Sequence, residues 1–335
     1  MIIFLDPIYY HSNRGIGVVT RNIERQLQCT CVGPSLLKKE TANMILNCGI
    51  LYLIWEQIIL PLILRKLRPE YFFATGGTGP YFIPSKIKQI LWVHDVLFLE
   101  ETQVNRRGYS ARQKLGHVYR KFIFRKCINN SFKIVAISHF TLSRLKKKMK
   151  IDKPLTVIQN YVEPPDRLPK LETKEDICVI FTSYAINKGA SFVNQALALN
   201  SAVKDQLKIV VLGIDAPLNI RSHNVKFHKN LSNSELSQVM GKARFCVIPS
   251  NYEGFGLPIA EAVFHNCIPI SSDIPVFKEL NPHFSEINLD EPMSLWNAIS
   301  KYLANPDTYQ YLDNTRSKFL KFNETFNRKI IKILE

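Results

Sequence analysis

The chain has 335 residues, of which 46% are hydrophobic and 21% are charged. This length suits two domains of roughly 150 residues each, and this composition excludes a disordered chain. The seven cysteines are scattered without a CxxC pair, which argues against a zinc site or a disulfide framework and favours a reducing cytoplasm. The first residues, MIIFLDP, lack a basic segment and are expected to form a β-strand, not a signal peptide.

The formal net charge of +16 is concentrated in the first half of the chain. Residues 1–165 contain 25 Lys and Arg against 10 Asp and Glu, whereas residues 166–335 contain 19 against 18. The two halves therefore carry net charges of +15 and +1. This segregation indicates that one domain faces an anionic partner: nucleic acid, a phosphorylated acceptor or an anionic membrane. A merely solubilising surface explains the net charge but not its uneven placement.

In the first half, apolar β-branched runs alternate with longer helical patterns, which predicts βα units and a parallel sheet. The apolar segment 44–64 is nearly long enough to span a bilayer. Glu56 and Pro61 interrupt it, so a buried or interfacial helix is favoured. A basic helix is expected at 109–129. The expected strands are 2–6, 71–75, 89–94, 132–137 and 155–158.

The segment 163–176, EPPDRLPKLETKED, is rich in proline and charge and is predicted to be a linker. The pattern predicts an α/β protein with two doubly wound Rossmann-like domains, 1–165 and 166–310. A C-terminal helix, 311–335, is expected to return to the N-terminal domain. Ligands of such sheets bind beyond the carboxyl ends of the strands, here in the cleft between the domains. The later expected elements are strands 177–182, 207–213, 225–228, 245–250 and 267–271 and helices 293–303 and 308–334.

The sequence SNYEGFGLPIAEA, residues 250–262, directly follows an expected strand. Glu253 and Glu261 bracket seven residues. Gly254 and Gly256 allow tight backbone turns, and Pro258 suits the first turn of the helix that follows. A glycine-bearing loop that opens a helix presents backbone N–H groups to a diphosphate. Carboxylates beside such a loop make strong hydrogen bonds to sugar and ribose hydroxyls. An ordinary capped helix explains one of the glutamates but not the whole pattern.

This stretch resembles the E-x7-E signature of family-4 retaining glycosyltransferases, whose typical form is EGFGLPxxEA. The family has the GT-B fold, in which two Rossmann-like domains face each other across a cleft. The resemblance implies that Glu253 contacts the donor sugar, Glu261 the ribose hydroxyls, and the Gly256–Leu257 backbone the diphosphate. Gly254 and Phe255 belong to the same implied donor-binding set.

The segment FTSYAINKG, residues 181–189, resembles the strand and loop that carry the family's phosphate-binding arginine and lysine. Lys188 matches the lysine, which implies a catalytic and donor-binding cation. Ser183 stands where the family has its arginine, so the clamp on the leaving phosphate has one assured cation in place of two. A surface lysine without a catalytic role is the alternative interpretation of Lys188.

The segment WVHDVLFL, residues 92–99, places His94 and Asp95 at the end of an expected strand. It resembles the family's HD element, in which the histidine lies beside the reacting sugar, so His94 is a catalytic candidate and Asp95 an acceptor-side one. A structural histidine is the alternative. The segment 136–141, AISHFT, resembles the family's VSEFT, which makes Ser138 a further acceptor-side candidate.

A second glycine-bearing loop, SNRGIGVVTRNI at residues 12–23, opens the first expected helix. It resembles the family's glycine-rich loop on the acceptor side, which assigns Gly15 and Gly17 to that side. As a dinucleotide fingerprint the loop fails, because the third glycine position is Thr20.

No D-x-D sequence occurs, so no metal and no other cofactor is expected. Protein cations and helix N-termini are expected to stabilise the departing phosphate. The resemblance implies retention of configuration, and with no obvious carboxylate nucleophile a front-face displacement is predicted. The expected donor is a GDP-, dTDP- or UDP-linked hexose, with mannose or rhamnose favoured.

The expected acceptor is a lipid-linked oligosaccharide of a bacterial surface glycan such as O antigen or capsule. The basic half is expected to dock on an anionic membrane, which places the protein peripherally on the cytoplasmic face of the inner membrane. One alternative is a catalytically degenerate GT-B protein that binds a glycan or a partner, which Ser183 supports. Another is a nucleic-acid-binding protein with aromatic residues interleaved in its basic half, but it has no recognisable binding module and leaves the glutamate motif unexplained.

Overall fold

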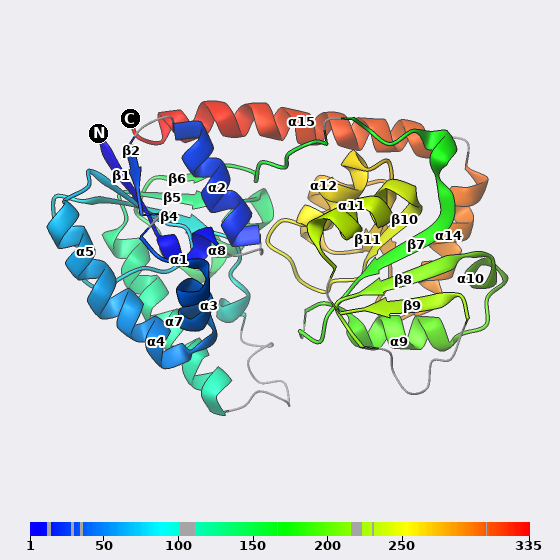
Figure 1. The fold of residues 1–335 in the computed structure, drawn as a ribbon, viewed down its shortest axis with the longest axis horizontal. Helices are drawn as coiled ribbons and strands as arrows, with labels where there is room; N and C mark the ends of the chain where they lie inside the picture. Colours follow the sequence, from blue (N-terminus) through cyan, green and yellow to red (C-terminus); the bar gives the residue numbers. More distant parts are fainter. Residues whose placement is uncertain are drawn as a thin grey trace. The chain divides into compact units, whose positions relative to one another are not determined.

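The structure is a computed structural model, and it describes ten segments of the chain. They divide into two compact units, Met1–Tyr161 with Phe322–Glu335 and Val162–Lys321. Each unit is built on one six-stranded sheet whose paired strands are all parallel (Figure 1). The α/β class and the doubly wound architecture expected from the sequence are confirmed. The described residues are 1–11, 15–27, 30–33, 36–100, 111–165, 167–185, 187–215, 223–229, 231–305 and 307–335.

The sheet of the first unit has the strand order β2-β1-β3-β4-β5-β6. From β1 the chain continues to β2 on one side and then to β3 on the other, so the switch point of the sheet lies between β1 and β3. The strands are β1 (Ile2–Leu5), β2 (Thr30–Val32), β3 (Tyr71–Ala74), β4 (Lys88–Val93), β5 (Lys133–Ala136) and β6 (Leu155–Val157).

Helices cover both faces of this sheet, which is why β3 is buried at every position. On one face, Leu64 and Phe124 join the hydrophobic core beneath the strands. On the other, the ring of Trp92 lies 6.2 Å from that of Phe326 near the C-terminus. The helices are α1 (Pro7–Tyr10), α2 (Gly15–Leu27), α3 (Lys39–Asn47), α4 (Gly49–Ile54), the π-helical turn η1 (Trp55–Ile59), α5 (Leu60–Leu67), η2 (Leu97–Leu99), α7 (Ala111–Asn130) and α8 (His139–Lys148).

The sheet of the second unit has the order β12-β11-β10-β7-β8-β9, so its switch point lies between β7 and β10. Its core includes Phe192 and Trp296, and the indole Nε1 of Trp296 donates to the carbonyl oxygen of Ala196 at 2.9 Å. The strands are β7 (Glu175–Phe181), β8 (Lys208–Leu212), β9 (Val225–His228), β10 (Ala243–Ile248), β11 (Ile268–Ser272) and β12 (Ser285–Ile287).

The helices of the second unit lead into a long C-terminal helix, α15 (Thr308–Lys332). Residues 308–321 of α15 belong to the second unit, and residues 322–332 belong to the first. The other helices are η3 (Leu171–Thr173), α9 (Ala190–Ala198), α10 (Ala202–Gln206), α11 (Asn233–Lys242), α12 (Leu257–Phe264), α13 (Pro275–Leu280) and α14 (Ser294–Ala304).

The ten expected strands correspond to β1 and β3–β11. β2 and β12 were not predicted from the sequence, because they are three residues long, lie at sheet edges and are too short for a recognisable alternation. The linker expected at 163–176 ends earlier, because β7 already begins at Glu175.

The apolar segment 44–64 is divided among α3, α4, η1 and α5. Within the described part of the chain, no single helix has both the length and the hydropathy of a membrane span. Helix 39–47 and helix 49–67 meet those criteria only as a pair, and they are bent by 106° relative to each other.

Candidate functional site

In the second unit, the loops that follow β7 and β10 are joined at the switch point of the sheet. The side-chain amide of Asn187 donates to the carbonyl oxygen of Tyr252 at 2.9 Å. The backbone N–H of Asn251 donates to the carbonyl oxygen of Asn187 at 3.0 Å. The two segments that the sequence analysis singled out, 181–189 and 250–262, are therefore brought together by neighbouring strands.

The charged groups of these two loops pair directly. Lys188 Nζ forms an ion pair with Glu253 Oε1, and Ser250 Oγ donates to the same carboxylate oxygen at 2.8 Å. The side chain of Lys188 is 35% exposed and that of Glu253 is 15% exposed, so the pair opens to solvent on the lysine side. Thr182 Oγ1 holds the lysine backbone by donating to the Lys188 carbonyl oxygen at 2.7 Å. An incoming anion therefore meets a lysine that is already positioned.

Two glycines let these loops enter their helices. Gly189 precedes α9 with φ of +69°, and a Cβ there would lie 2.0 Å from the carbonyl oxygen of Pro249. Gly256 precedes α12 with φ of +117°, and a Cβ there would lie 2.8 Å from Cε1 of Phe277. The first N–H groups of a helix have no intrahelical partner and attract anions. The Lys188–Glu253 pair is thus flanked by two helix N-termini that suit a diphosphate.

The remaining donor-side candidates occupy different environments. Glu261 lies in α12, where burial raises the pKa of its carboxyl group. Phe255 is buried, and its ring lies 6.2 Å from that of Phe319, so it anchors the loop in the core. Ser183 is half-buried, and its Oγ accepts the backbone N–H of Ala185 at 3.3 Å. Gly254 is buried between the two ends of the glutamate motif, and Leu257 is half-buried at the start of α12.

In the first unit, His94 follows β4 and its ring orientation is set by a backbone carbonyl. Nε2 lies 2.7 Å from the carbonyl oxygen of Thr75, which directly follows β3. Since a carbonyl oxygen only accepts, Nε2 carries the hydrogen. Burial lowers the pKa of His94, so near neutral pH the ring is uncharged and Nδ1 carries a lone pair. Its neighbour Asp95 is exposed, and its Oδ1 accepts the N–H of Leu97 at 3.0 Å.

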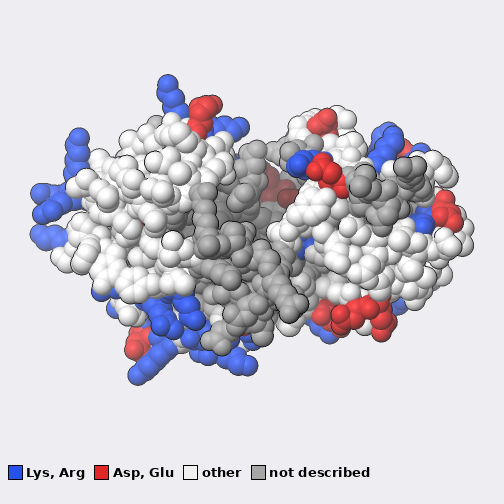
Figure 2. Space-filling model, turned by 90° about the horizontal axis from the view of Figure 1, so that it is seen from below, with Lys and Arg blue, Asp and Glu red and all other residues white. Residues whose placement is uncertain are grey.

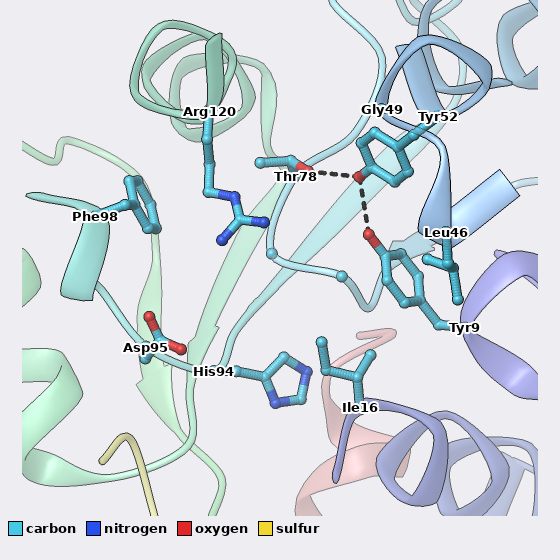
Figure 3. Close-up of a pocket in the computed structure, with 12 residues that line it drawn as sticks. Tyr9, Ile16, Leu46, Gly49, Tyr52, Thr78, His94, Asp95, Phe98 and Arg120 are labelled. Atoms are coloured by element: carbon cyan, nitrogen blue, oxygen red, sulfur yellow. Dashed lines mark hydrogen bonds between the residues drawn. The ribbon is translucent and has the colours of Figure 1, made fainter. Parts of the chain in front are cut away.

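His94 and Asp95 line a pocket of 320 Å³, which we call the polar pocket (Figure 3). Figure 3 shows Arg120 extending from α7 toward the middle of this pocket, opposite a group of hydroxyls. Those hydroxyls belong to residues that the sequence analysis did not predict: Tyr9, Tyr52 and Thr78. The other lining residues are Ile16, Leu46, Gly49, Gly76, Gly77 and Phe98.

The other acceptor-side candidates lie at helix starts. Gly15 and Gly17 are in the first turn of α2, and Ile16 between them lines the polar pocket. Residues 12–14 of the same predicted loop lie outside the described residues. Ser138 is buried as the N-cap of α8, where its Oγ accepts the N–H of Thr141 at 3.0 Å.

A buried carboxylate, Glu56 in η1, lies behind the hydroxyls of the polar pocket and is 2% exposed. Its Oε1 accepts the hydroxyls of Tyr52 at 2.7 Å and Thr78 at 2.6 Å. Its Oε2 accepts the hydroxyl of Tyr119 at 2.5 Å and the amide of Gln57 at 3.0 Å. The signal for this group was present in the sequence, because a lone charge in an apolar segment requires hydrogen-bond partners.

A second buried acid, Asp6, caps α1 directly after β1. Its Oδ1 accepts the N–H of Ile8 at 3.1 Å and the indole Nε1–H of Trp55 at 3.3 Å. Burial outweighs these hydrogen bonds and raises the pKa of Asp6 to about 7, with a further contribution from the negative charge of Glu56. Burial likewise raises the pKa of Glu56, against the effect of its four hydrogen bonds.

Residues 166–319 match the family model described as glycosyl transferases group 1. The O-antigen chain mannosyltransferase RfbU of Salmonella typhimurium is 25% identical over 252 residues, which cover 72% of this chain and 68% of that protein. A GDP-mannose:cellobiosyl-diphosphopolyprenol alpha-mannosyltransferase of Xanthomonas oryzae pv. oryzae is 31% identical over 113 residues. This second alignment covers 30% of this chain and 29% of the Xanthomonas protein.

Two solved structures match nearly the whole chain. HepE of Anabaena, solved in complex with UDP and glucose, superimposes with a TM-score of 0.70 at 14% identity, covering 99% of this chain and 98% of that one. Sucrose-phosphate synthase of Thermosynechococcus elongatus gives a TM-score of 0.70 at 14% identity, with coverage of 99% and 97%. At this identity the likeness concerns the fold alone.

Proposed function

From the match of residues 166–319 to the glycosyl transferases group 1 family and the GT-B fold of the chain, we propose a retaining, metal-independent mannosyltransferase. Its donor is GDP-mannose and its acceptor is a hydroxyl of a lipid-linked bacterial surface glycan such as O antigen. The names of RfbU and of the Xanthomonas relative, both mannosyltransferases, support the sugar. The observation that carries the proposal is the Lys188–Glu253 pair between two helix N-termini.

The donor belongs to the second unit. Its diphosphate binds at the N-termini of α9 and α12 and takes Lys188 away from Glu253, since the two negative charges of the diphosphate attract the ammonium more strongly than one carboxylate does. The released Glu253 then accepts hydroxyls of the donor sugar. Glu261 accepts the ribose hydroxyls. The ion pair is in this view the resting state of the donor site.

The reaction replaces one glycosidic bond by another on the same face of the sugar. The bond from C1 to the phosphate oxygen breaks, and the bond from C1 to the acceptor oxygen forms. The proton of the acceptor hydroxyl passes to the departing phosphate. Lys188 and the helix N-termini stabilise the charge on that phosphate, and one such group contributes on the order of 3 kcal/mol. The absence of D-x-D from the sequence supports a role for protein cations here.

The acceptor belongs to the first unit, at the polar pocket with His94. The first unit contains 28 Lys and Arg against 11 Asp and Glu, a net charge of +17, and the second contains 16 against 17, a net of −1. On the face drawn in Figure 2, blue side chains gather mainly over the first unit, on the left. This charge supports docking at the cytoplasmic face of an anionic inner membrane.

A donor panel with site variants tests this function. GDP-mannose in the presence of EDTA is expected to raise the melting temperature by about a few degrees, and UDP-glucose and dTDP-rhamnose are expected not to. Glu261→Gln removes the carboxylate that accepts the ribose hydroxyls and is expected to abolish the shift. A response to UDP-glucose alone contradicts the donor assignment, and a response that EDTA abolishes contradicts metal independence. Binding of GDP-mannose without transfer to any lipid-linked acceptor favours the non-catalytic alternative.

A further inference from the structure

The polar pocket of the first unit adjoins a second cavity of opposite character. This apolar groove has a volume of 220 Å³ and lies between α4 and α7. Gly49, Tyr52, Thr78 and Arg120 line both cavities, so the two adjoin at these residues. The lining residues that belong to the groove alone are Ile50, Leu53, Leu115, Gly116 and Tyr119.

The hydroxyls of the polar pocket are oriented by Glu56. Since Tyr52 donates its single hydroxyl hydrogen to Glu56, it accepts the hydrogen of Tyr9, whose hydroxyl lies 2.8 Å away. Thr78 also donates to Glu56. The oxygens of these hydroxyls are therefore left with lone pairs toward the pocket. Without the buried carboxylate, the same hydroxyls would be able to rotate and donate.

Two further groups on the pocket wall are acceptors. His94 presents Nδ1 as a lone pair because its Nε2 hydrogen is used by Thr75. The exposed Asp95 carboxylate lines the same pocket. A wall of acceptors selects a ligand with several hydrogen-bond donors, and a sugar, which offers a hydroxyl on most of its carbons, has this property. The volume of 320 Å³ is at the small end of ligand pockets, about 300–1,000 Å³, which favours a short glycan.

Arg120 lies where the two cavities join, and it is the one Lys or Arg among the described residues that line them. Its guanidinium carbon lies 5.8 Å from the centre of the Phe98 ring. No carboxylate forms an ion pair with it in the part of the chain that the structure describes. Figure 3 shows the guanidinium directed into the pocket, toward the hydroxyl wall. A planar guanidinium is well suited to bind a phosphate.

The groove itself presents large apolar side chains to solvent. Ile50 is 70% exposed, Leu115 is 72% exposed and Leu53 is 37% exposed. Gly116 widens the groove, because a Cβ placed on it would meet no atom within 4 Å. Exposed apolar surface beside a polar pocket marks a ligand-binding groove, and the chemistry that fits it is a hydrocarbon chain.

We propose that the first unit binds the phosphate-proximal end of a lipid-linked saccharide. The sugar next to the phosphate lies in the polar pocket, the phosphate on Arg120, and the hydrocarbon along the groove over Gly116. Glu56 is a positioning residue that acts through the Tyr52, Thr78 and Tyr9 hydroxyls. This inference rests on the proposed function and narrows its acceptor to a glycan with few sugars between the phosphate and the accepting hydroxyl.

Three probes separate the contributions of sugar, phosphate and chain. They are decyl mannosyl phosphate, mannose 1-phosphate, which lacks the chain, and decyl mannoside, which lacks the phosphate. Calorimetric titration into the full chain, with no donor present, gives their dissociation constants. The complete probe is expected to bind at least about tenfold more tightly than either fragment, a factor that corresponds to about 1.4 kcal/mol.

Two substitutions are expected to remove the contributions of the phosphate and of the hydrocarbon chain to binding, one at a time. Arg120→Gln keeps the contribution of the chain but makes decyl mannosyl phosphate and decyl mannoside bind equally. Gly116→Leu fills the groove and makes decyl mannosyl phosphate and mannose 1-phosphate bind equally. Gly116→Ala, the matched small substitution, is expected to retain the tight binding of the complete probe.

The sugar is tested by Tyr9→Phe, which removes one acceptor from the wall but leaves the buried Glu56 with its four partners. This variant is expected to weaken decyl mannosyl phosphate severalfold and to leave decyl phosphate, which has no sugar, unchanged. Equal weakening of both ligands contradicts the assignment of the sugar to the polar pocket.

Vesicles of phosphatidylglycerol distinguish the glycolipid from bulk lipid. If Arg120→Gln and Gly116→Leu reduce vesicle binding as much as they reduce binding of the complete probe, the surface is a general membrane contact and the proposal is wrong. It is equally wrong if neither variant discriminates among the probes. The melting-temperature response to GDP-mannose in the same samples separates the two proposals. If the variants discriminate among the probes but GDP-mannose gives no response, the proposed function alone is wrong. If GDP-mannose gives a response but the variants do not discriminate among the probes, this inference alone is wrong.

Discussion

The two units use the same structural rule to build sites of different chemistry. Each has a six-stranded parallel sheet, and each gathers candidate side chains beyond the carboxyl ends of its strands, after β1, β3 and β4 in the first unit and after β7 and β10 in the second. In the second unit the cation Lys188 is paired with Glu253. In the first, Arg120 faces a wall of hydroxyls. The fold therefore decides where a ligand binds, and the side chains decide which ligand it is.

The two units also differ in the partners that stabilise their buried carboxyl groups. Among the buried acids of the first unit, Asp6 and Glu56 have hydroxyl, indole and amide donors as neighbours, whereas Glu100 pairs with Arg144 and Lys148. The second unit balances the half-buried Glu253 with a lysine. Asp6 and Glu56 thus depend on neutral donors, whereas Glu253 depends on a cation. Four predictions, two on charged side chains and two on glycines, compare the two units.

The largest expected effect is on the pH dependence of the first unit. Burial raises the pKa of Asp6 from 3.8 to about 7, so the folded state binds its proton more tightly than the unfolded state does. This stabilisation is complete below pH 4 and is lost as the pH rises to 7, a change of about 4 kcal/mol. Asp6→Asn is expected to remove that slope, as measured by urea unfolding between pH 4 and 8.

The native chain also contains His94, whose lowered pKa has the opposite sign and destabilises the folded state as the pH falls below about 6.5. Because Asp6→Asn retains His94, the difference between the two unfolding curves isolates the aspartate. Parallel curves across this range contradict the burial of a protonated Asp6.

The next largest effect is expected from Lys188→Ala in the second unit. It removes the cation that stabilises the departing phosphate, and the rate of transfer at saturating donor is expected to fall about 100- to 1,000-fold, or about 3 kcal/mol. Lys278→Ala is the matched control, because Lys278 pairs with Asp273 in the same unit but both side chains are at least half exposed. A rate for Lys188→Ala within a few-fold of this control shows that the lysine is structural.

A smaller effect is expected from Gly256→Ala at the start of α12. The alanine has to adopt φ of +117°, and its Cβ would lie 2.8 Å from Phe277 Cε1. Backbone strain and overpacking together are expected to lower the free energy of unfolding by about 2 kcal/mol. Thermal unfolding monitored by circular dichroism measures it, and an unchanged melting temperature means that the loop relaxes at no cost.

The smallest effect is expected from a glycine-to-alanine substitution in the first unit, Gly116→Ala, and it changes the free energy of unfolding in the opposite direction. Gly116 lies inside α7 with open space around it. Gly116→Ala adds helix propensity and is expected to raise the free energy of unfolding by about 0.5–1 kcal/mol. Urea unfolding of Gly256→Ala and Gly116→Ala under the same conditions measures both changes in the free energy of unfolding. A destabilised Gly116→Ala shows that the groove is less open than the structure indicates.

Local patterns were sufficient for most of the strands and helices. Strands such as β4 and β10 are runs of buried apolar residues, because a parallel sheet is covered on both faces. The glycines and Pro258 around the start of α12 meet local backbone requirements, which a sequence displays directly. The edge strands β2 and β12 were missed because three residues carry too little pattern.

Only some residues of the polar pocket could be predicted from the sequence. His94 and Asp95 were predicted from their place after a strand, and the tertiary structure adds them to a pocket with Tyr52 and Arg120. Arg120 is one of many basic residues in its helix, and no local signal distinguishes it. Glu56 had such a signal, a single charge in an apolar run, but its four donors come from α4, η1, α7 and the loop after β3.

The sequence by itself therefore determined most of the strands and helices, where the basic charge lies, and which loop places glycines and Pro258 at the start of a helix. Tertiary structure alone decided that Tyr9, Tyr52, Thr78 and Arg120 share one pocket, and that Lys188 meets Glu253. The physical reason is that backbone requirements and hydrophobic periodicity act over a few neighbouring residues. The contacts within a site depend on strand order, which places segments far apart in the chain side by side.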